Sequence, residues 1–149
     1  MPEDESTTTT EALEAARARR IDLKSAVSAV EVAAASPAGD PEWRPDLVNE
    51  LRGLREAFDG HVAEVEGEDG LLAELLLHAP QLANQIRNVQ GEHPGLCAQI
   101  DQALERVEAD GSADEVRDLV LQTLIGIARH RQHGADLVYR AYSIDIGGG

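Results

Sequence analysis

Apolar residues recur in alternating steps of four and three along most of this chain, and this spacing restricts the fold more than any other feature. Such steps place side chains on one face of an α-helix, whereas a half-buried β-strand needs period-two alternation. The longest series has these members: Val116, Val120, Thr123, Ile127, His130, Gly134, Leu137 and Ala141. It predicts a helix from Ser112 to about Tyr142 with one face turned toward a partner helix.

Capping signals and breaker residues mark the ends of this helix and of two others. Ser112 and Glu115 have the spacing of a capping box, in which a serine and a glutamate side chain each accept a backbone N–H bond. Residues 8–34 begin with the same spacing and carry a seven-member stripe, which Ser36-Pro37 ends. Asp40-Pro41 reads as an N-cap followed by a proline at the first helical position, and the helix that it opens runs to Glu66.

A third long helix is predicted between Pro80 and Val107, with a kink in its middle. Its stripe comprises Leu82, Ile86, Val89, His93, Leu96, Ile100, Ala103 and Val107. Pro94 lacks an amide donor and clashes with the preceding turn, so we expect the kink beside His93. The apolar segment from Leu71 to His78 forms a short helical connector before it.

These elements predict a single all-α domain, an antiparallel up-down four-helix bundle. A chain of 149 residues is long enough to bury a substantial core, and four long helices joined by short turns pack in this way. We assign the bundle to residues 10–143. Residues 1–9 are acidic and polar, which predicts a disordered tail, and the glycine-rich residues 144–149 predict a flexible C-terminal tail.

Charge and composition exclude two classes of partner. The formal net charge of −15 repels both nucleic-acid phosphates and anionic lipid surfaces, and no basic cluster reverses it locally. Cys97 is the only cysteine, which rules out an internal disulfide, and nothing resembles a signal peptide or a membrane span. A cytoplasmic location is therefore the expectation.

Three of the predicted helices each place one histidine on the core-facing stripe. These residues are His61, His93 and His130. His93 and His130 are equally distant in sequence from the Gly111–Ser112 turn, so both should stand roughly 28 Å from it at a rise of about 1.5 Å per residue. Imidazoles that meet in the core of a bundle can hold a transition metal. Without metal, they can form a hydrogen-bonded polar layer that helps to specify helix pairing.

Three stretches of the chain resemble a known family. They are HVAEVEGEDGLLAELL from His61, EHPGL from Glu92 and RHRQHGADLVYRAYSIDIGGG from Arg129. With the order of the helices, these motifs are similar to hemerythrin-like proteins of the HHE cation-binding type over roughly residues 11–149. The resemblance implies a four-helix bundle with a non-haem di-iron centre that is used for oxygen binding, iron handling or sensing.

Residue by residue, the resemblance assigns metal ligation to His61, His93 and His130, with Glu66 as the matching carboxylate. The chain departs from the family pattern at three points, one of which is Val65, flanked by Glu64 and Glu66, at the position one turn after His61. No histidine precedes His61, where Arg20 or Lys24 stands instead, and Gly134 replaces the carboxylate expected one turn after His130. The ligand count therefore predicts a reduced site that holds one metal, with iron as the expected ion and Glu66 or water completing the three histidines.

Several nearby residues have open roles at this stage. Cys97 and His133 are alternative ligands, although a buried hydrophobe and a surface position are their more frequent roles. Glu92, Asp136 and Tyr139 are candidates to orient an imidazole. No nucleophile–base pair or phosphate-binding loop is recognisable, so an enzymatic activity is not indicated.

Two functional hypotheses follow from these observations. The first is a hemerythrin-like protein that binds a metal or an oxygen-related ligand at a reduced site. The second is a metal-free hemerythrin-like bundle whose acidic surface contacts a protein partner, as an interaction or regulatory module.

Overall fold

The computed structural model describes residues 22–67 and 70–147, together with the isolated helical positions 11 and 14. The predicted tail at residues 1–9 and the beginning of the first predicted helix lie outside this part. Within it, residues 22–35 are helical and are followed by helices α2, α3, α4, α5 and α6. Their bounds are Trp43–Glu66, Leu71–His78, Ala83–Gly91, His93–Glu108 and Ala113–Gly147, with a short 3₁₀ helix, η1, at Pro80–Leu82. No strand occurs among the described residues, which confirms the all-α class.

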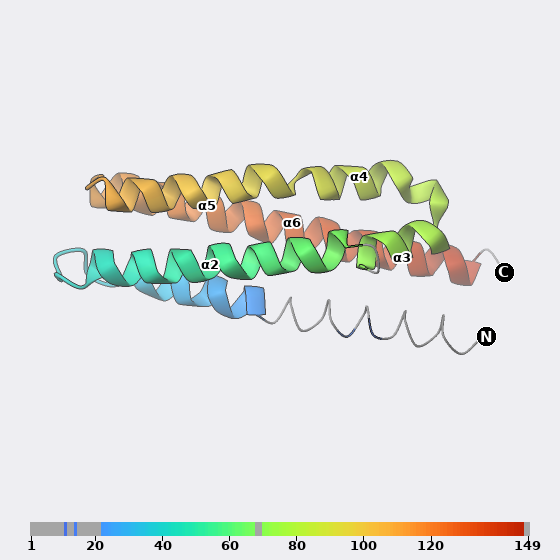
Figure 1. Ribbon diagram of the computed structural model, residues 1–149, viewed down its shortest axis with the longest axis horizontal. Helices are drawn as coiled ribbons and strands as arrows, with labels where there is room; N and C mark the ends of the chain where they lie inside the picture. The colour runs from blue at the N-terminus through green and yellow to red at the C-terminus, as the bar shows by residue number, and fades with distance from the viewer. Residues whose placement is uncertain (1–10, 12–13, 15–21, 68–69, 148–149) are drawn as a thin grey trace.

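The helices lie side by side as a bundle (Figure 1). Helix α5 packs against both α2 and α6, and the turn at residues 109–112 returns the chain alongside α5. Asp110 has a φ of 58° in this turn, and a Cβ on Gly111 would lie 2.9 Å from the carbonyl oxygen of Arg106. The tight turn fixes which residues of α5 lie opposite which residues of α6.

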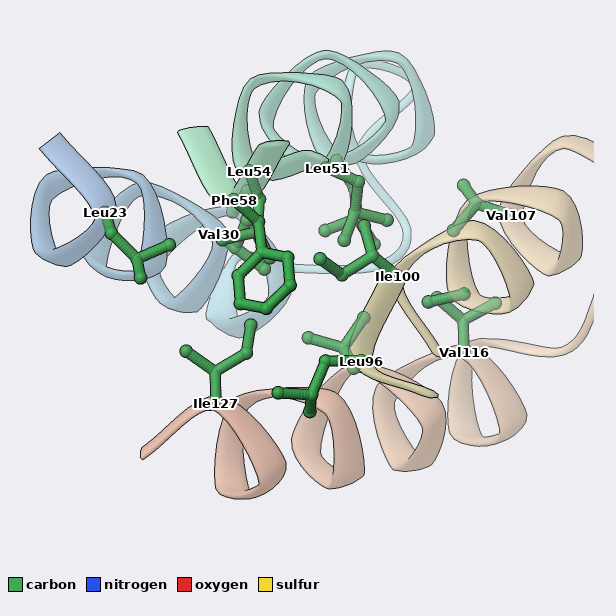
Figure 2. Close-up of a cluster of buried hydrophobic side chains, with 14 of the residues drawn as sticks. Leu23, Val30, Leu51, Leu54, Phe58, Leu96, Ile100, Val107, Val116 and Ile127 are labelled. Atoms are coloured by element: carbon green, nitrogen blue, oxygen red, sulfur yellow. The ribbon is translucent and has the colours of Figure 1, made fainter. Parts of the chain in front are cut away.

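A large apolar cluster fills one end of the bundle and contains predicted stripe residues from each of the long helices. Leu23 and Val30 come from residues 22–35, Phe58 from α2, Ile100 from α5 and Ile127 from α6 (Figure 2). Each is at most 1% exposed. At about 25 cal/mol per Å² of apolar surface removed from water, this cluster contributes much of the driving force for folding.

The predicted kink beside His93 is confirmed and divides the third helix in two. Helix α4 ends at Gly91, and α5 begins at His93 with Pro94 in its first turn, where the missing proline amide costs no helical hydrogen bond. A second apolar cluster surrounds α4 and α3, with members that include Val65, Leu75 and Val89. The two apolar clusters are thus separate.

The ends of two helices, α2 and α6, differ in detail from the sequence-based expectations. Ser112 Oγ accepts the Glu115 amide at 3.2 Å as predicted, but the Glu115 carboxylate pairs with Arg106 rather than completing the box. Helix α2 begins at Trp43, because Asp40 Oδ1 accepts the Glu42 amide in a turn before the helix.

At the other end of the chain, α6 continues past Tyr142 to Gly147. The expected end near Tyr142 was therefore too early, because residues 143–146 include no proline or glycine that would stop the helix. None of the helices in the described part of the chain combines the length and apolarity needed to cross a lipid bilayer.

Candidate metal centre

Three helices bring His61, His93 and His130 together, as the sequence predicts. His61 follows Phe58 by three residues on α2, His93 is the first residue of α5, and His130 lies on α6. His93 and His130 are each only 2% exposed, and His61 is partly buried. The sequence predicts that His93 and His130 lie at equal distances from the Gly111–Ser112 turn, and the contact between their rings confirms this prediction.

The Nε2 atoms of the three imidazoles point toward one another. His130 Nε2 lies 3.2 Å from His61 Nε2 and 3.1 Å from His93 Nε2. One nitrogen from each of the three rings belongs to a group in which every pair of atoms lies within 4.8 Å. Two nitrogens bound tetrahedrally to one metal at about 2.05 Å stand about 3.3 Å apart, so these spacings fit a shared metal ion.

Carboxylates hold the opposite nitrogens of two of these rings. Glu66 Oε1 lies 2.5 Å from His93 Nδ1, and Glu92 Oε1 lies 3.0 Å from His130 Nδ1. An ionised carboxylate can only accept, so each Nδ1 carries the proton and donates it. In the neutral form of each ring, the inner Nε2 atom is consequently an acceptor, which is the form of imidazole that binds a metal.

Two acceptor nitrogens only 3.1 Å apart repel each other unless a cation lies beside them. Burial lowers the pKa of His130, the Glu92 hydrogen bond opposes this shift, and the neighbouring His93 reinforces it. Protonation of His130 is thereby disfavoured. A transition metal satisfies the same nitrogens without protonating them.

The structure places Glu66 differently from the direct ligand suggested by the resemblance. Its carboxylate contacts the outer nitrogen of His93 and does not belong to the convergent group of three nitrogens. Because the two nitrogens of an imidazole point in diverging directions, Glu66 in this position orients His93 instead of completing the cluster.

Glu92 has a second histidine partner, His133, which the sequence offered as an alternative ligand and which the structure places on the carboxylate instead. Glu92 Oε2 lies 2.9 Å from Nδ1 of His133, whose side chain is 44% exposed. Although partial burial opposes it, the hydrogen bonds from His130 and His133 lower the pKa of Glu92. Glu92 therefore stays ionised and links the buried His130 to the surface His133.

The other residues with open roles lie away from the three nitrogens. Cys97 is half-buried with Sγ 4.0 Å from Asp59 Oδ1, and burial raises its thiol pKa, which makes it a poor soft ligand. Asp136 accepts a hydrogen bond from Gln132, and Tyr139 is 75% exposed. Of the three candidates to orient an imidazole, only Glu92 makes that contact in the structure.

The histidine layer separates the two apolar clusters. On one side, the Phe58 ring lies 5.7 Å from the ring centre of His61, 5.9 Å from that of His93 and 6.0 Å from that of His130. On the other side lies a cavity of about 360 Å³ that all three histidines help to line. Gly134, one turn after His130, also lines this cavity, and a Cβ there would meet no atom within 4 Å.

The fold and this site define a class: an all-helical bundle with a buried three-histidine cluster, two orienting carboxylates and an adjoining cavity. Comparisons with family models, with curated proteins and with solved structures found no match to this chain.

Proposed function

We propose that this chain is a metal-binding protein in which His61, His93 and His130 hold one transition-metal ion through their Nε2 atoms. The observation that carries the proposal is the pairing of convergent inner nitrogens with carboxylate-bound outer nitrogens. Carboxylate–histidine pairs of this kind fix the tautomer and raise the basicity of metal-binding histidines.

The donor set supports one metal rather than two. A di-iron centre in a helical bundle takes several carboxylate ligands, whereas Glu66 and Glu92 are both engaged with outer imidazole nitrogens. Three imidazoles suit iron, zinc, copper or nickel. We propose iron as the physiological ion and a hemerythrin-like, antiparallel up-down bundle as its scaffold, from the resemblance of the sequence motifs.

When bound, the metal supplies a Lewis-acidic centre with room for a ligand that does not come from the protein. The protein supplies the rest of the site. Glu66 and Glu92 orient two imidazoles, Phe58 excludes water from one side, and the cavity leaves the other side accessible. Among the residues that the structure describes, none is placed beside the cluster to act as a nucleophile, and we propose binding rather than catalysis.

The test is metal content, measured by elemental analysis on protein purified without a histidine tag and again after anaerobic loading with Fe(II). We expect close to one metal ion per chain. His130→Ala should lose it, while His78→Ala should retain it, because His78 is a largely exposed histidine paired only with Glu74. Metal at one hundred times its Kd should also stabilise the wild-type protein by about 2.7 kcal/mol.

A second candidate, the metal-free interaction module, is favoured by large apolar side chains on the surface. Leu77 is 76% exposed, Tyr139 75% and Val32 70%. If neither purification nor anaerobic loading gives bound metal, the metal-binding proposal is refuted and the acidic bundle with these exposed side chains becomes the better explanation.

A further inference from the structure

The cavity beside the histidine cluster is larger than a metal and a diatomic ligand require. Its volume of about 360 Å³ falls at the lower end of the range for small-molecule sites. Helices α2, α3, α4 and α6 supply an apolar wall that begins at the histidines. Its aliphatic members include Val65, Leu72, Leu75, Val89 and Val138. A wall of this kind stabilises an aliphatic group by removing it from water.

One cation lines the same cavity. Arg131 follows His130 on α6 and is half-buried. No carboxylate forms an ion pair with it among the residues that the structure describes, whereas Arg55 and Arg106 each pair with at least one. A guanidinium presents a planar array of donors that matches a carboxylate, so Arg131 supplies the polar contact that an apolar cavity otherwise lacks.

Building on the proposed metal site, we infer that this cavity binds an aliphatic monocarboxylate of medium chain length. The carboxylate head faces the histidine cluster and Arg131, and the tail lies among the aliphatic side chains of α2, α3 and α4. The net charge of −15 opposes binding of an anion, so the head depends on the local positive charge of Arg131 and the metal. The tail makes the site selective for chain length.

Gly134 lines the cavity together with the three histidines and presents no side chain to it. Gly134 lies in the middle of α6, where glycine costs about 1 kcal/mol relative to alanine. A Cβ there would enter open space rather than collide with a neighbour. Packing therefore does not require glycine at this position, but access from the cavity to the histidines benefits from it.

The experiment titrates Co(II)-loaded protein with acetate, butanoate and hexanoate and follows the Co(II) d–d absorption together with calorimetric binding. We expect affinity to rise about fourfold per methylene, and so about 16-fold from butanoate to hexanoate. Hexan-1-ol, which has the same tail without the charge, should bind more weakly than hexanoate by a factor on the order of ten or more.

Two variants separate the head from the tail. Arg131→Gln should weaken acetate and hexanoate by a similar factor and leave the dependence on chain length intact. Gly134→Leu should fill the cavity and remove the preference for hexanoate while Co(II) still binds. Gly53→Leu is the matched control, because Gly53 is exposed on α2 with open space around its Cβ and does not line the cavity.

The possible failures are distinguishable. A protein that binds no Co(II) overturns both the metal-site proposal and this inference. A protein that binds Co(II) but has equal affinity for acetate and hexanoate overturns the inference alone. Equal binding of hexan-1-ol and hexanoate refutes the role of Arg131 and of the carboxylate head.

Discussion

Replacing Glu66 or Glu92 by glutamine tests whether these carboxylates act through the histidines that they contact. Glutamine keeps an acceptor oxygen and the length of the side chain but removes the charge. A hydrogen bond to a charged group contributes about 1.5–3 kcal/mol and a neutral one about 0.5–1.5 kcal/mol, so the difference is about 1–1.5 kcal/mol. Each substitution should therefore weaken metal binding by about tenfold.

The structure places this effect in the lower part of the tenfold to hundredfold range typical of residues that orient metal ligands. Glu66 and Glu92 are 29% and 31% exposed, so water partly screens their charge. The two carboxylates act on different imidazoles, and the double variant should lose on the order of a hundredfold. Competition titration with a chromophoric chelator measures these changes.

The control is Glu56→Gln, an exposed position on α2 that makes the same change in net charge. The metal affinity of the Glu56→Gln variant should equal that of the wild type. If Glu66→Gln and Glu92→Gln also bind within twofold of the wild type, the proposed role of the outer nitrogens is refuted. If Glu66→Gln changes the Co(II) absorption spectrum strongly, Glu66 is itself a ligand and its placement against His93 does not describe the metal-bound protein.

Two further predictions concern stability. Ile100→Ala should reduce the free energy of unfolding by about 2–5 kcal/mol in urea titrations because Ile100 is fully buried, while Leu121→Ala, at 57% exposed, should change it by less than about 0.5 kcal/mol. Equal effects would contradict the assigned core. Because burial lowers the pKa of His130 below its ordinary value of 6.5, the unfolded chain binds more protons, and the metal-free protein should lose stability as pH falls through 6.5. Thermal unfolding between pH 7.5 and 5.5 measures how stability changes with pH, and this change should be smaller in His130→Gln. Glu92, whose pKa is lowered, stays ionised throughout this range.

The fold class and the histidine cluster could be predicted because both depend on helical periodicity. Val89, His93 and Leu96 share a face on any regular helix, and their burial follows from which face is apolar. The interruption of that helix was also predictable, since Pro94 cannot accept a position in a helix interior without the loss of a backbone bond.

The carboxylate partners were less predictable, because they depend on how neighbouring helices pack. Glu66 reaches from the end of α2 to His93 at the start of α5, a contact that spacing along either helix does not specify. Glu92 lies in the break between α4 and α5, and its two histidine partners are both on α6. Long side chains at helix ends have several partners within reach, and only the packed structure selects one.

The positions of the carboxylates favour the proposed metal site over a purely structural polar layer. A structural layer is most stable when donors and acceptors alternate, because an unsatisfied buried group costs about 1–3 kcal/mol. Here Glu66 and Glu92 both take the outer proton of a histidine, which turns the acceptor nitrogens of His93 and His130 toward each other at 3.1 Å. The same two contacts that disfavour the metal-free arrangement prepare the rings for a cation. Under the proposed function, folding and metal binding should therefore be coupled in this chain, with the bundle gaining stability from an ion held by the histidines that the two glutamates orient.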